Sequence, residues 1–330
     1  MPFLGAVKYQ VNPVRVGVDV PLFLYLAIAY RPDSESYQVA FEISPEKMIN
    51  NIQFAIGGIN ISVEGDSEPA ALDIPSAYRP FVKGGKADVT LRLHEKTLVP
   101  TAGKKIFESP PIWSLYRNNG TSILRIFEKM PGYGRTLILP QHIENTDLYF
   151  DDPTGNYYNP FLGPTIELLM VNYLAQGRGV ILHGCGIKHD DCGFLFVGES
   201  GAGKTTMAKI WSQESDVEVL SDDRTIVRKK DGHFVMYGTP WHGEGKFGSP
   251  GSVKLDQIFF IKHAGVNSIL ESNKAHSVTQ FLQCSFPTFW DSAGMEYSMD
   301  VFSDLAATIP CRMLSFKPDA GIVEFVDNLL

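Results

Sequence analysis

The first 150 positions contain short runs in which apolar and polar residues alternate, and this pattern is typical of β-strands. Val89, Leu91 and Leu93 alternate with polar neighbours, which is the period of a strand with one buried face. Other short apolar runs are separated by breaks that carry glycine or proline: Gly57-Gly58, Gly84-Gly85 and Pro110-Pro111. The pattern therefore predicts a β-rich N-terminal part.

A hairpin is predicted between residues 113 and 127. The apolar runs 113–116 and 122–127 flank the segment Arg117-Asn118-Asn119-Gly120. Asn119 and Gly120 can both adopt the positive φ that a tight hairpin turn requires.

Near residue 151 the pattern changes from strand to helix periodicity. A turn-rich segment, 151–156, precedes a run whose apolar residues recur at i, i+3, i+4, i+7 and i+8. This spacing predicts a helix with one apolar face formed by Ile166, Leu169, Met170, Tyr173 and Leu174. Gly177 and Gly179 are expected to end it.

Strands and helices alternate in the remainder of the chain. Strands are predicted over 180–182, 194–197 and 217–220, and a helix over roughly 204–213. Asp190-Asp191, between the first two strands, is interpreted as a solvated hairpin turn. This alternation indicates an α/β core. The expected organisation is a smaller β-rich N-terminal domain, residues 1–150, followed by an α/β domain, residues 151–330.

The composition is that of a globular protein without a nucleic-acid-binding surplus of positive charge. Of the 330 residues, 44% are hydrophobic and 20% are charged, which argues against wholesale disorder. The formal net charge of −8 offers no basic excess to neutralise phosphates, so nucleic acid is not an expected partner.

The cysteine pattern and the apolar stretches predict a soluble, cytoplasmic protein. The four cysteines form no C-x-x-C pair and resemble ordinary buried thiols in a reducing compartment. The N-terminus lacks the features of a secretory signal. The longest apolar stretch, residues 21–30, is about half of what a membrane span needs, so no membrane association is expected.

The segment 198–205 fits the pattern G-x-x-x-x-G-K-[ST] and predicts a phosphate-binding loop. An apolar run precedes it and a helical pattern follows it, as such a loop requires. Lys204 is expected to reach the β- and γ-phosphates, and the Thr205 hydroxyl to ligate Mg²⁺. The residues expected to bind the nucleotide are Gly198, Glu199, Ser200, Gly201, Ala202, Gly203, Lys204, Thr205 and Thr206.

Two further features could complete a phosphoryl-transfer site. Asp222-Asp223 follows an apolar strand about twenty residues after the loop, where one carboxylate could sit on a metal and the other could accept a proton. Its position favours this role over a solvated acidic turn. His183 directly follows the strand 180–182, and its position leaves open whether it is a site residue or a satisfied polar group.

These motifs, in this order, resemble the catalytic domain of the HPr kinase/phosphorylase family, which shares its core with ATP-dependent phosphoenolpyruvate carboxykinase. The resembling stretches read ILHGCGIKHDDCGFLFVGESGAGKTTMAKIW (181–211) and VEVLSDDRTIVRKKDGHFVMYGTPWHGEG (217–245). The resemblance implies an α/β fold with a P-loop phosphoenolpyruvate carboxykinase/HPr kinase-like core and a smaller β-rich N-terminal domain. That N-terminal part looks more like the β-rich leader of HPr-kinase-related proteins than like the N-terminal domain of bacterial HPr kinases.

The resemblance implies a role for each matching residue. Lys204 matches the phosphate-binding lysine, and Thr205 the metal-binding hydroxyl. Asp222 matches the general base, Asp223 the metal-side carboxylate, and His183 the histidine beside the reacting phosphate. In the sequence, the family's E-[IV]-R-G-x-G motif falls on PWHGEG, so Pro240 stands where the motif has a glutamate. Lys246, Arg312 and His242 are the candidates to replace the family's arginine-bearing loop.

The expected function is therefore a kinase that uses ATP and Mg²⁺. Its partners would be a nucleoside triphosphate and a hydroxyl-bearing acceptor, with serine of a peptide or protein, or a small molecule, as the expected class. The alternative is a nucleotide-binding module that regulates or scaffolds a partner without phosphorylating it. Carboxykinase chemistry on a keto acid is less favoured, because the chain is short for it. HPr kinases are oligomers, and the sequence leaves a monomer and a homo-oligomer both open.

Overall fold

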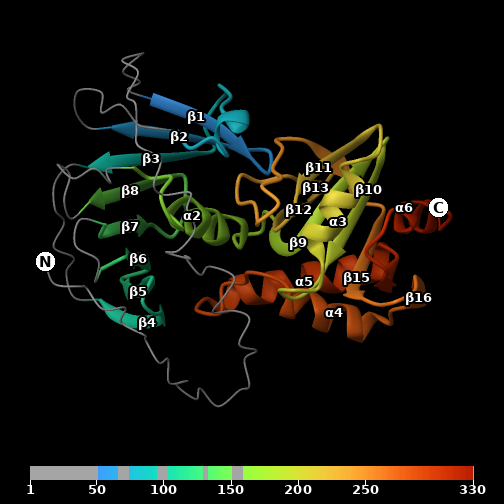
Figure 1. Ribbon diagram of the computed structural model, residues 1–330. Helices are drawn as coiled ribbons and strands as arrows, with labels where there is room; N and C mark the ends of the chain where they lie inside the picture. Colours follow the sequence, from blue (N-terminus) through green and yellow to red (C-terminus); the bar gives the residue numbers. More distant parts are fainter. Residues whose placement is uncertain (1–50, 66–73, 95–102, 129–132, 151–158, 330) are drawn as a thin grey trace, which may run out of the picture.

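The protein contains two large mixed β-sheets and few helices, so the coarse prediction of an α/β fold is confirmed (Figure 1). The computed structural model describes residues 51–65, 74–94, 103–128, 133–150 and 159–329. The turn-rich segment predicted at 151–156 and the apolar stretch at 21–30 lie outside the described residues. The domain boundary at 150/151 stays a prediction.

The first sheet has eight strands in the order β1-β2-β3-β8-β7-β6-β5-β4. β3 is parallel to both of its neighbours, β2 and β8. All other neighbouring strands of this sheet are antiparallel. The predicted alternation is seen in β3, where Val89, Leu91 and Leu93 are buried. The elements are β1 (Asn51–Ile56), β2 (Ile59–Gly65), the 3₁₀ helix η2 (Arg79–Phe81), β3 (Val89–His94), β4 (Lys104–Ser109), β5 (Trp113–Asn118), β6 (Thr121–Ile126), β7 (Arg135–Leu139) and β8 (Asn145–Phe150).

The predicted hairpin is formed by β5 and β6. Asn119 and Gly120 form its turn with φ angles of 47° and 82°, as a two-residue turn with positive φ at both positions requires. The strands extend further than predicted, because Arg117 pairs with Ser122 and Asn118 with Thr121.

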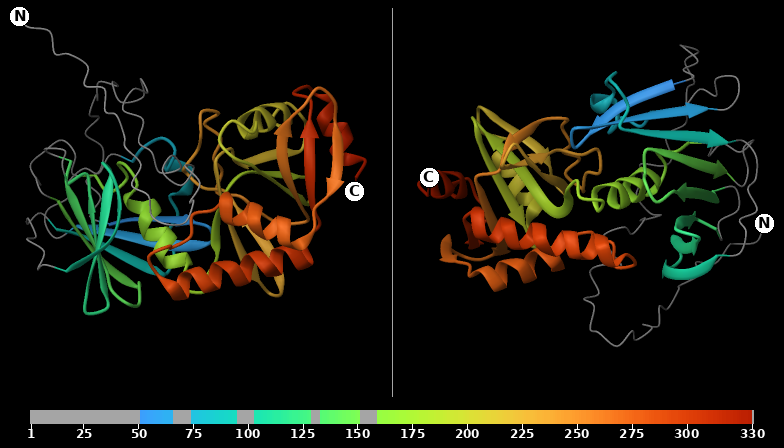
Figure 2. Two further views of the ribbon diagram at one scale, coloured as in Figure 1. Left: turned by 90° about the horizontal axis from the view of Figure 1, so that it is seen from below. Right: turned by 180° about the vertical axis from the view of Figure 1, so that it is seen from behind.

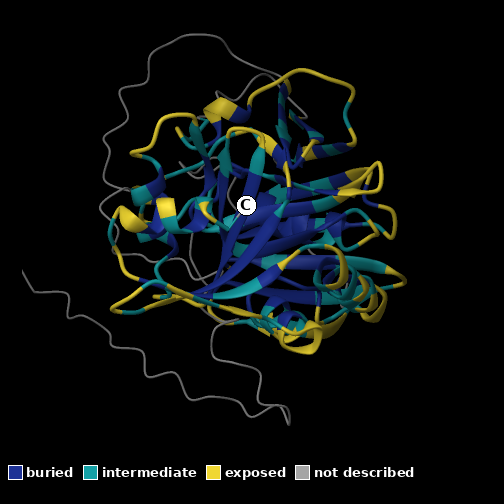
Figure 3. Ribbon diagram, turned by 90° about the vertical axis from the view of Figure 1, so that its right-hand side faces the viewer, coloured by how far each residue is buried: buried dark blue, intermediate teal, exposed yellow. Residues whose placement is uncertain are grey.

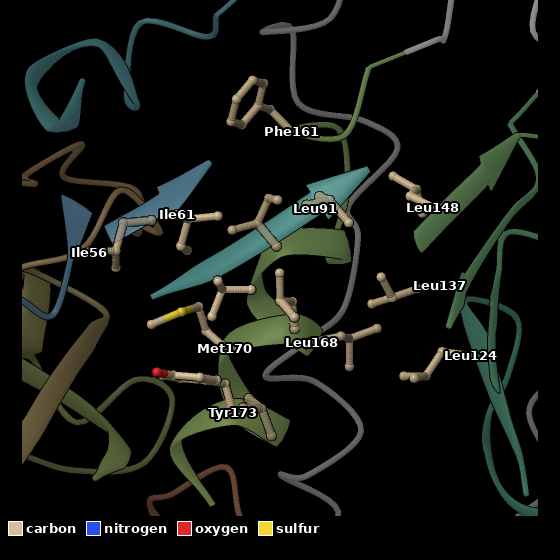
Figure 4. Close-up of a cluster of buried hydrophobic side chains, with 14 of the residues drawn as sticks. Ile56, Ile61, Leu91, Leu124, Leu137, Leu148, Phe161, Leu168, Met170 and Tyr173 are labelled. Carbon is tan, nitrogen blue, oxygen red and sulfur yellow. The ribbon is translucent and has the colours of Figure 1, made fainter. Parts of the chain in front are cut away.

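Helix α2 (Thr165–Leu174) lies between the two sheets (Figures 1 and 2). The prediction of a single apolar face was too narrow, since every residue of the helix except Asn172 is buried. Figure 4 shows Leu168, Met170 and Tyr173 directed into a cluster with side chains of the first sheet such as Leu91. The helix is thus part of the core of the first sheet.

The second sheet has nine strands in the order β14-β13-β12-β9-β10-β15-β17-β16, and β11 also pairs with β9. β10, β15 and β17 are parallel to one another, whereas the remaining pairs are antiparallel. The strands are β9 (Val180–His189), β10 (Cys192–Val197), β11 (Val217–Ser221), β12 (Arg224–Lys230), β13 (His233–Tyr237), β14 (Ser252–Lys254), β15 (Gln257–His263), β16 (Ser268–Glu271) and β17 (Cys311–Phe316).

Helices cover both faces of the second sheet (Figure 2). α3 (Lys204–Trp211) and α6 (Gly321–Asp327) pack on one face, and α4 (Lys274–Gln283) and α5 (Ser292–Thr308) pack on the other. Burial follows this layering, because the strands are mostly buried while the connecting loops carry most exposed residues (Figure 3). Among the described helices, none has both the length and the apolar character needed to cross a bilayer.

Strand β9 corrects one prediction. His183 was expected at the end of a short strand, but the strand continues to His189 and His183 lies within it. Glycine is depleted in strands, yet β9 runs through Gly184 and Gly186. β9 continues because it pairs with β10 on one side and with β12 and β11 on the other. The turn predicted at Asp190-Asp191 joins β9 to β10.

Candidate active site

The phosphate-binding loop predicted at 198–205 connects β10 to α3, which is the strand–loop–helix context that such a loop needs. Gly201 and Gly203 have φ angles of 85° and 106°, which side chains rarely adopt. Gly203 is also confined, since a Cβ there would lie 2.6 Å from both the His263 ring and the Phe316 ring. The glycines therefore permit the tight path of the loop.

Lys204 turns back onto its own loop. Its Nζ donates to the carbonyl oxygens of Gly198 and Glu199 at 2.7 and 2.8 Å. The side chain is buried, and burial lowers the pKa of the ammonium, against the opposing effect of Asp223. The loop crest from Glu199 to Gly201 is exposed, so a phosphate can approach it and compete with the carbonyls for this ammonium.

Asp222 is enclosed beside the loop. Only 1% of the residue is exposed, and its Oδ1 and Oδ2 accept the backbone N–H groups of Gly243 and Gly245, each at 2.8 Å. The Thr205 hydroxyl donates to Oδ2 at 3.4 Å. The carboxylate nearest the hydroxyl that is expected to bind metal is thus Asp222, whereas the family resemblance gave the metal-side role to Asp223.

Asp223 pairs with His183. The His183 Nε2 lies 2.9 Å from the Asp223 Oδ1, and the two side chains are 16% and 21% exposed. Burial lowers the pKa of His183, and the positive charges of Lys204 and Arg224 lower it further. These effects outweigh that of Asp223, whose hydrogen bond raises the pKa. The imidazole is therefore neutral near pH 7 and is held by a carboxylate.

Arg224 links this pair to α2. Its guanidinium contacts Asp223 on one side and the buried Glu167 of α2 on the other. Arg224 Nε lies 2.5 Å from Glu167 Oε1; this contact is ionic, because its angles do not suit a hydrogen bond. It also lies 5.1 Å from the Phe286 ring centroid. Burial would raise the pKa of Asp223, but Arg224 and His183 lower it to about 2.

The structure brings together five of the predicted site residues: Lys204, Thr205, Asp222, Asp223 and His183. Arg312, another candidate, lies elsewhere. Arg312 lies near the start of β17, which is parallel to β10, so it lies at the opposite end of the strands from the loop that follows β10. There it pairs with Glu271 and contacts Gln257. Arg312 therefore does not replace the family's arginine-bearing loop.

The segment 238–248 approaches the site through its backbone. The Trp241 indole is buried and donates to the Tyr78 hydroxyl at 2.9 Å. Gly243 and Gly245 supply the contacts to Asp222 instead. The Lys246 side chain is exposed next to them. This segment therefore connects the site to the first sheet.

The donors near the phosphate loop fit a magnesium ion that is bound mainly through a nucleotide. Among the described residues, no cluster of three or more His, Cys, Asp or Glu side chains could hold a metal on its own. Mg²⁺ usually takes one or two protein oxygens and completes its shell with phosphates and water. The Thr205 hydroxyl and the Asp222 carboxylate form such a pair.

Sequence reasoning missed Glu167, Arg224 and the two glycines that bind Asp222. Arg224 directly follows the Asp-Asp pair, and Glu167 is the single charged residue of α2. A lone carboxylate in a buried helix signals an ionic partner, because an unpaired buried charge is costly. The glycines gave no such signal, since their contribution is a backbone N–H.

No protein-family model matches the chain, and no match is found among curated proteins.

The shifted pKa of Asp223 predicts a loss of stability in acid. A group whose pKa is depressed in the folded state binds its proton more readily when unfolded, so its stabilising contribution is lost as the pH falls. With a shift from 3.8 to about 2, the loss occurs between about pH 4 and pH 2 and amounts to about 2 kcal/mol.

Urea unfolding at several pH values between 5 and 2 would measure this loss. In Asp223→Asn, the decline of the unfolding free energy over this range should be smaller by about 2 kcal/mol. Asp300→Asn, which removes an exposed carboxylate of α5, controls for the loss of one charge. Equal declines in the wild type and in Asp223→Asn would contradict the prediction.

Proposed function

We propose that the protein is an ATP-dependent kinase that transfers the γ-phosphoryl group to a hydroxyl of a peptide, protein or small molecule. One observation carries the proposal: next to a phosphate-binding loop, a buried carboxylate lies at the Thr205 hydroxyl and a His183–Asp223 pair remains partly accessible. A loop that only binds nucleotide does not need the second pair. Proton acceptance from an alcohol does need such a group.

The proposal divides the work between the two aspartates differently from the family resemblance. Asp222 is almost completely buried and lies at the Thr205 hydroxyl, so it suits the metal side of the site. Asp223 is more accessible and holds His183. The proposal therefore assigns proton acceptance to the His183–Asp223 pair.

The His183 Nε2–H donates to Asp223, which leaves Nδ1 as the nitrogen with a free lone pair. In the proposed reaction, the acceptor oxygen forms a bond to the γ-phosphorus, its proton moves to Nδ1, and the bond to the ADP oxygen breaks. Lys204 exchanges its two carbonyl partners for phosphate oxygens and offsets their charge. When bound, Mg²⁺ would neutralise charge that develops on the phosphates.

The strand arrangement supports an HPr kinase-like core. In that family, a His-Gly strand leads through a hairpin into the phosphate loop, and here β9, with His183-Gly184, is antiparallel to β10. The Asp-Asp pair follows β11, which is antiparallel to β9. The finer assignment, a phosphoenolpyruvate carboxykinase/HPr kinase-like fold, is part of the proposal.

A nucleotide-binding module without transferase activity is the second candidate. It is favoured by the enclosure of the site, because Lys204 is held by two carbonyls and Asp222 by two backbone N–H groups. If these contacts persist when nucleotide binds, Asp222 gains no free oxygen for a metal. The two candidates differ in turnover.

Incubation with γ-³²P-ATP and Mg²⁺ should label an acceptor from cell extract or from a serine-peptide library. The wild type should release ADP in proportion to the label, while Lys204→Met should transfer about 10²-fold less or no label, because it lacks the charge that faces the phosphates. Lys209→Met, an exposed lysine on the same helix, serves as the matched control. Protection from melting by ATP without any ADP release would favour the binding module.

A further inference from the structure

A cavity of about 540 Å³ lies between the first sheet and the helices α2 and α5. Its walls include Ser122 of β6, Leu139 of β7, Gln176 after α2 and Gly294 of α5. Small-molecule sites commonly have 300–1,000 Å³ and often occur where two packed units meet. The cavity is distinct from the phosphate loop. Glu167 contacts Arg224 near the start of α2, whereas the first residue of this helix that lines the cavity is Asn172, about 7.5 Å further along the axis.

Two arginines give this cavity a positive character. Arg117 of β5 is half-buried, and among the described residues its guanidinium has no hydrogen-bond or ion-pair partner. Arg178 is also half-buried, donates to the Gln176 backbone and stacks on the Tyr173 ring at 4.2 Å. A guanidinium placed in a cavity without a carboxylate partner is suited to a planar anion.

One carboxylate, Asp291, is present among the described residues that line the cavity, but it is already engaged. Its Oδ2 accepts the Gly294 N–H as the N-cap of α5, at 3.1 Å. The charges of the described lining side chains therefore sum to a positive value, in a protein whose formal net charge is −8. The positive charge of the cavity, opposite in sign to the net charge of the protein, favours an anionic ligand.

The remaining wall is mixed apolar and polar. Leu139, Pro140 and Ala293 provide apolar surface. Asn172 also lines the cavity, with its amide bonded to the Leu168 carbonyl and to the Trp290 indole. Thr288 is buried, and among the described residues its hydroxyl has no hydrogen-bond partner. Apolar surface beside a few placed polar groups is typical of sites for small organic ligands.

We propose that this cavity binds a small organic anion, with a carboxylate or phosphate head at Arg117 and an apolar part against Leu139 and Pro140. The site is separate from the proposed nucleotide site and does not depend on kinase activity.

Fluorescence titration of the full-length protein with 8-anilinonaphthalene-1-sulfonate tests the proposal, because the sulfonate stands in for the anionic head and the rings for the apolar part. N-phenyl-1-naphthylamine, the same skeleton without the sulfonate, should bind roughly tenfold more weakly or worse. Benzoate and phenyl phosphate, added as competitors, distinguish a carboxylate head from a phosphate head. Displacement by neither would overturn the proposal.

Three variants locate the binding. Arg117→Gln should weaken sulfonate binding roughly tenfold, and Arg117→Lys should restore most of it. Ala293→Trp, at an exposed position of the first turn of α5, should block the cavity and abolish binding. Arg92→Gln, an exposed arginine of β3, is the matched control and should bind as the wild type does. Circular dichroism verifies that each variant is folded, and wild-type affinity in both Arg117→Gln and Ala293→Trp would overturn the proposal.

Discussion

The substitution Asp222→Asn is expected to weaken the binding of Mg·ATP, whereas Asp223→Asn is expected to leave that binding near the wild-type value and to slow turnover. Asp222→Asn removes the negative charge beside Thr205, and the new amide nitrogen would face the N–H donor of either Gly243 or Gly245. Turnover in this variant should therefore fall by about 10²–10³-fold, together with affinity.

The second half of this expectation depends on His183. In Asp223→Asn, the side-chain amide nitrogen can face the imidazole and thereby favour the wrong tautomer, which in a His–Asp pair costs up to about 10⁴-fold in rate. Calorimetric titration with Mg²⁺ and a non-hydrolysable ATP analogue would measure binding, and single-turnover transfer would measure the chemical step. The reverse result, with binding lost at position 223 and only turnover lost at position 222, would restore the roles that the family resemblance implies.

Replacement of Arg224 by methionine should destabilise the protein by about 3–5 kcal/mol. Methionine retains much of the apolar contact with Phe286, but it leaves the buried carboxylate of Glu167 and the half-buried carboxylate of Asp223 without their shared cation. Burial already raises the pKa of Glu167 against the effect of Arg224, so removal of the guanidinium should favour the protonated form of Glu167.

Urea unfolding at pH 7 would measure this cost. Arg125→Met is the matched control, because Arg125 forms a largely exposed pair with Glu128, and its loss should cost less than about 1 kcal/mol. The double variant Arg224→Met/Glu167→Gln should recover part of the stability, since only the half-buried carboxylate of Asp223 then lacks its cation. A cost below about 1 kcal/mol for Arg224→Met would show that the cluster is well solvated.

The parts of the fold that were predicted correctly from the sequence are those determined by residues that are close together in the sequence. The hairpin turn at Asn119-Gly120 was predicted because its φ angles are encoded locally. The phosphate loop was predicted because its glycines and its lysine lie within eight consecutive positions, 198–205. In both cases the required conformation follows from residue types in one short window.

Long-range pairing could not be predicted in this way. The extension of β9 past Gly184 depends on partners such as β10 and β11, whose registers are not encoded in the strand itself. The contact between Arg224 and Glu167 joins residues 57 positions apart in the sequence, so no local pattern indicates it. The two N–H groups that enclose Asp222 belong to glycines, whose contribution is independent of any side chain.

The burial of α2 has a practical consequence for dividing the chain. A fragment that begins at residue 151 would retain the phosphate loop, but it would expose to water the side of α2 that packs against the first sheet, including Leu168 and Met170. Exposed apolar surface of this kind promotes aggregation. The helix would also lose the support that keeps Glu167 at Arg224. The eight-stranded sheet therefore covers a surface that the rest of the chain cannot cover alone, and deletion studies of this protein should keep the two together.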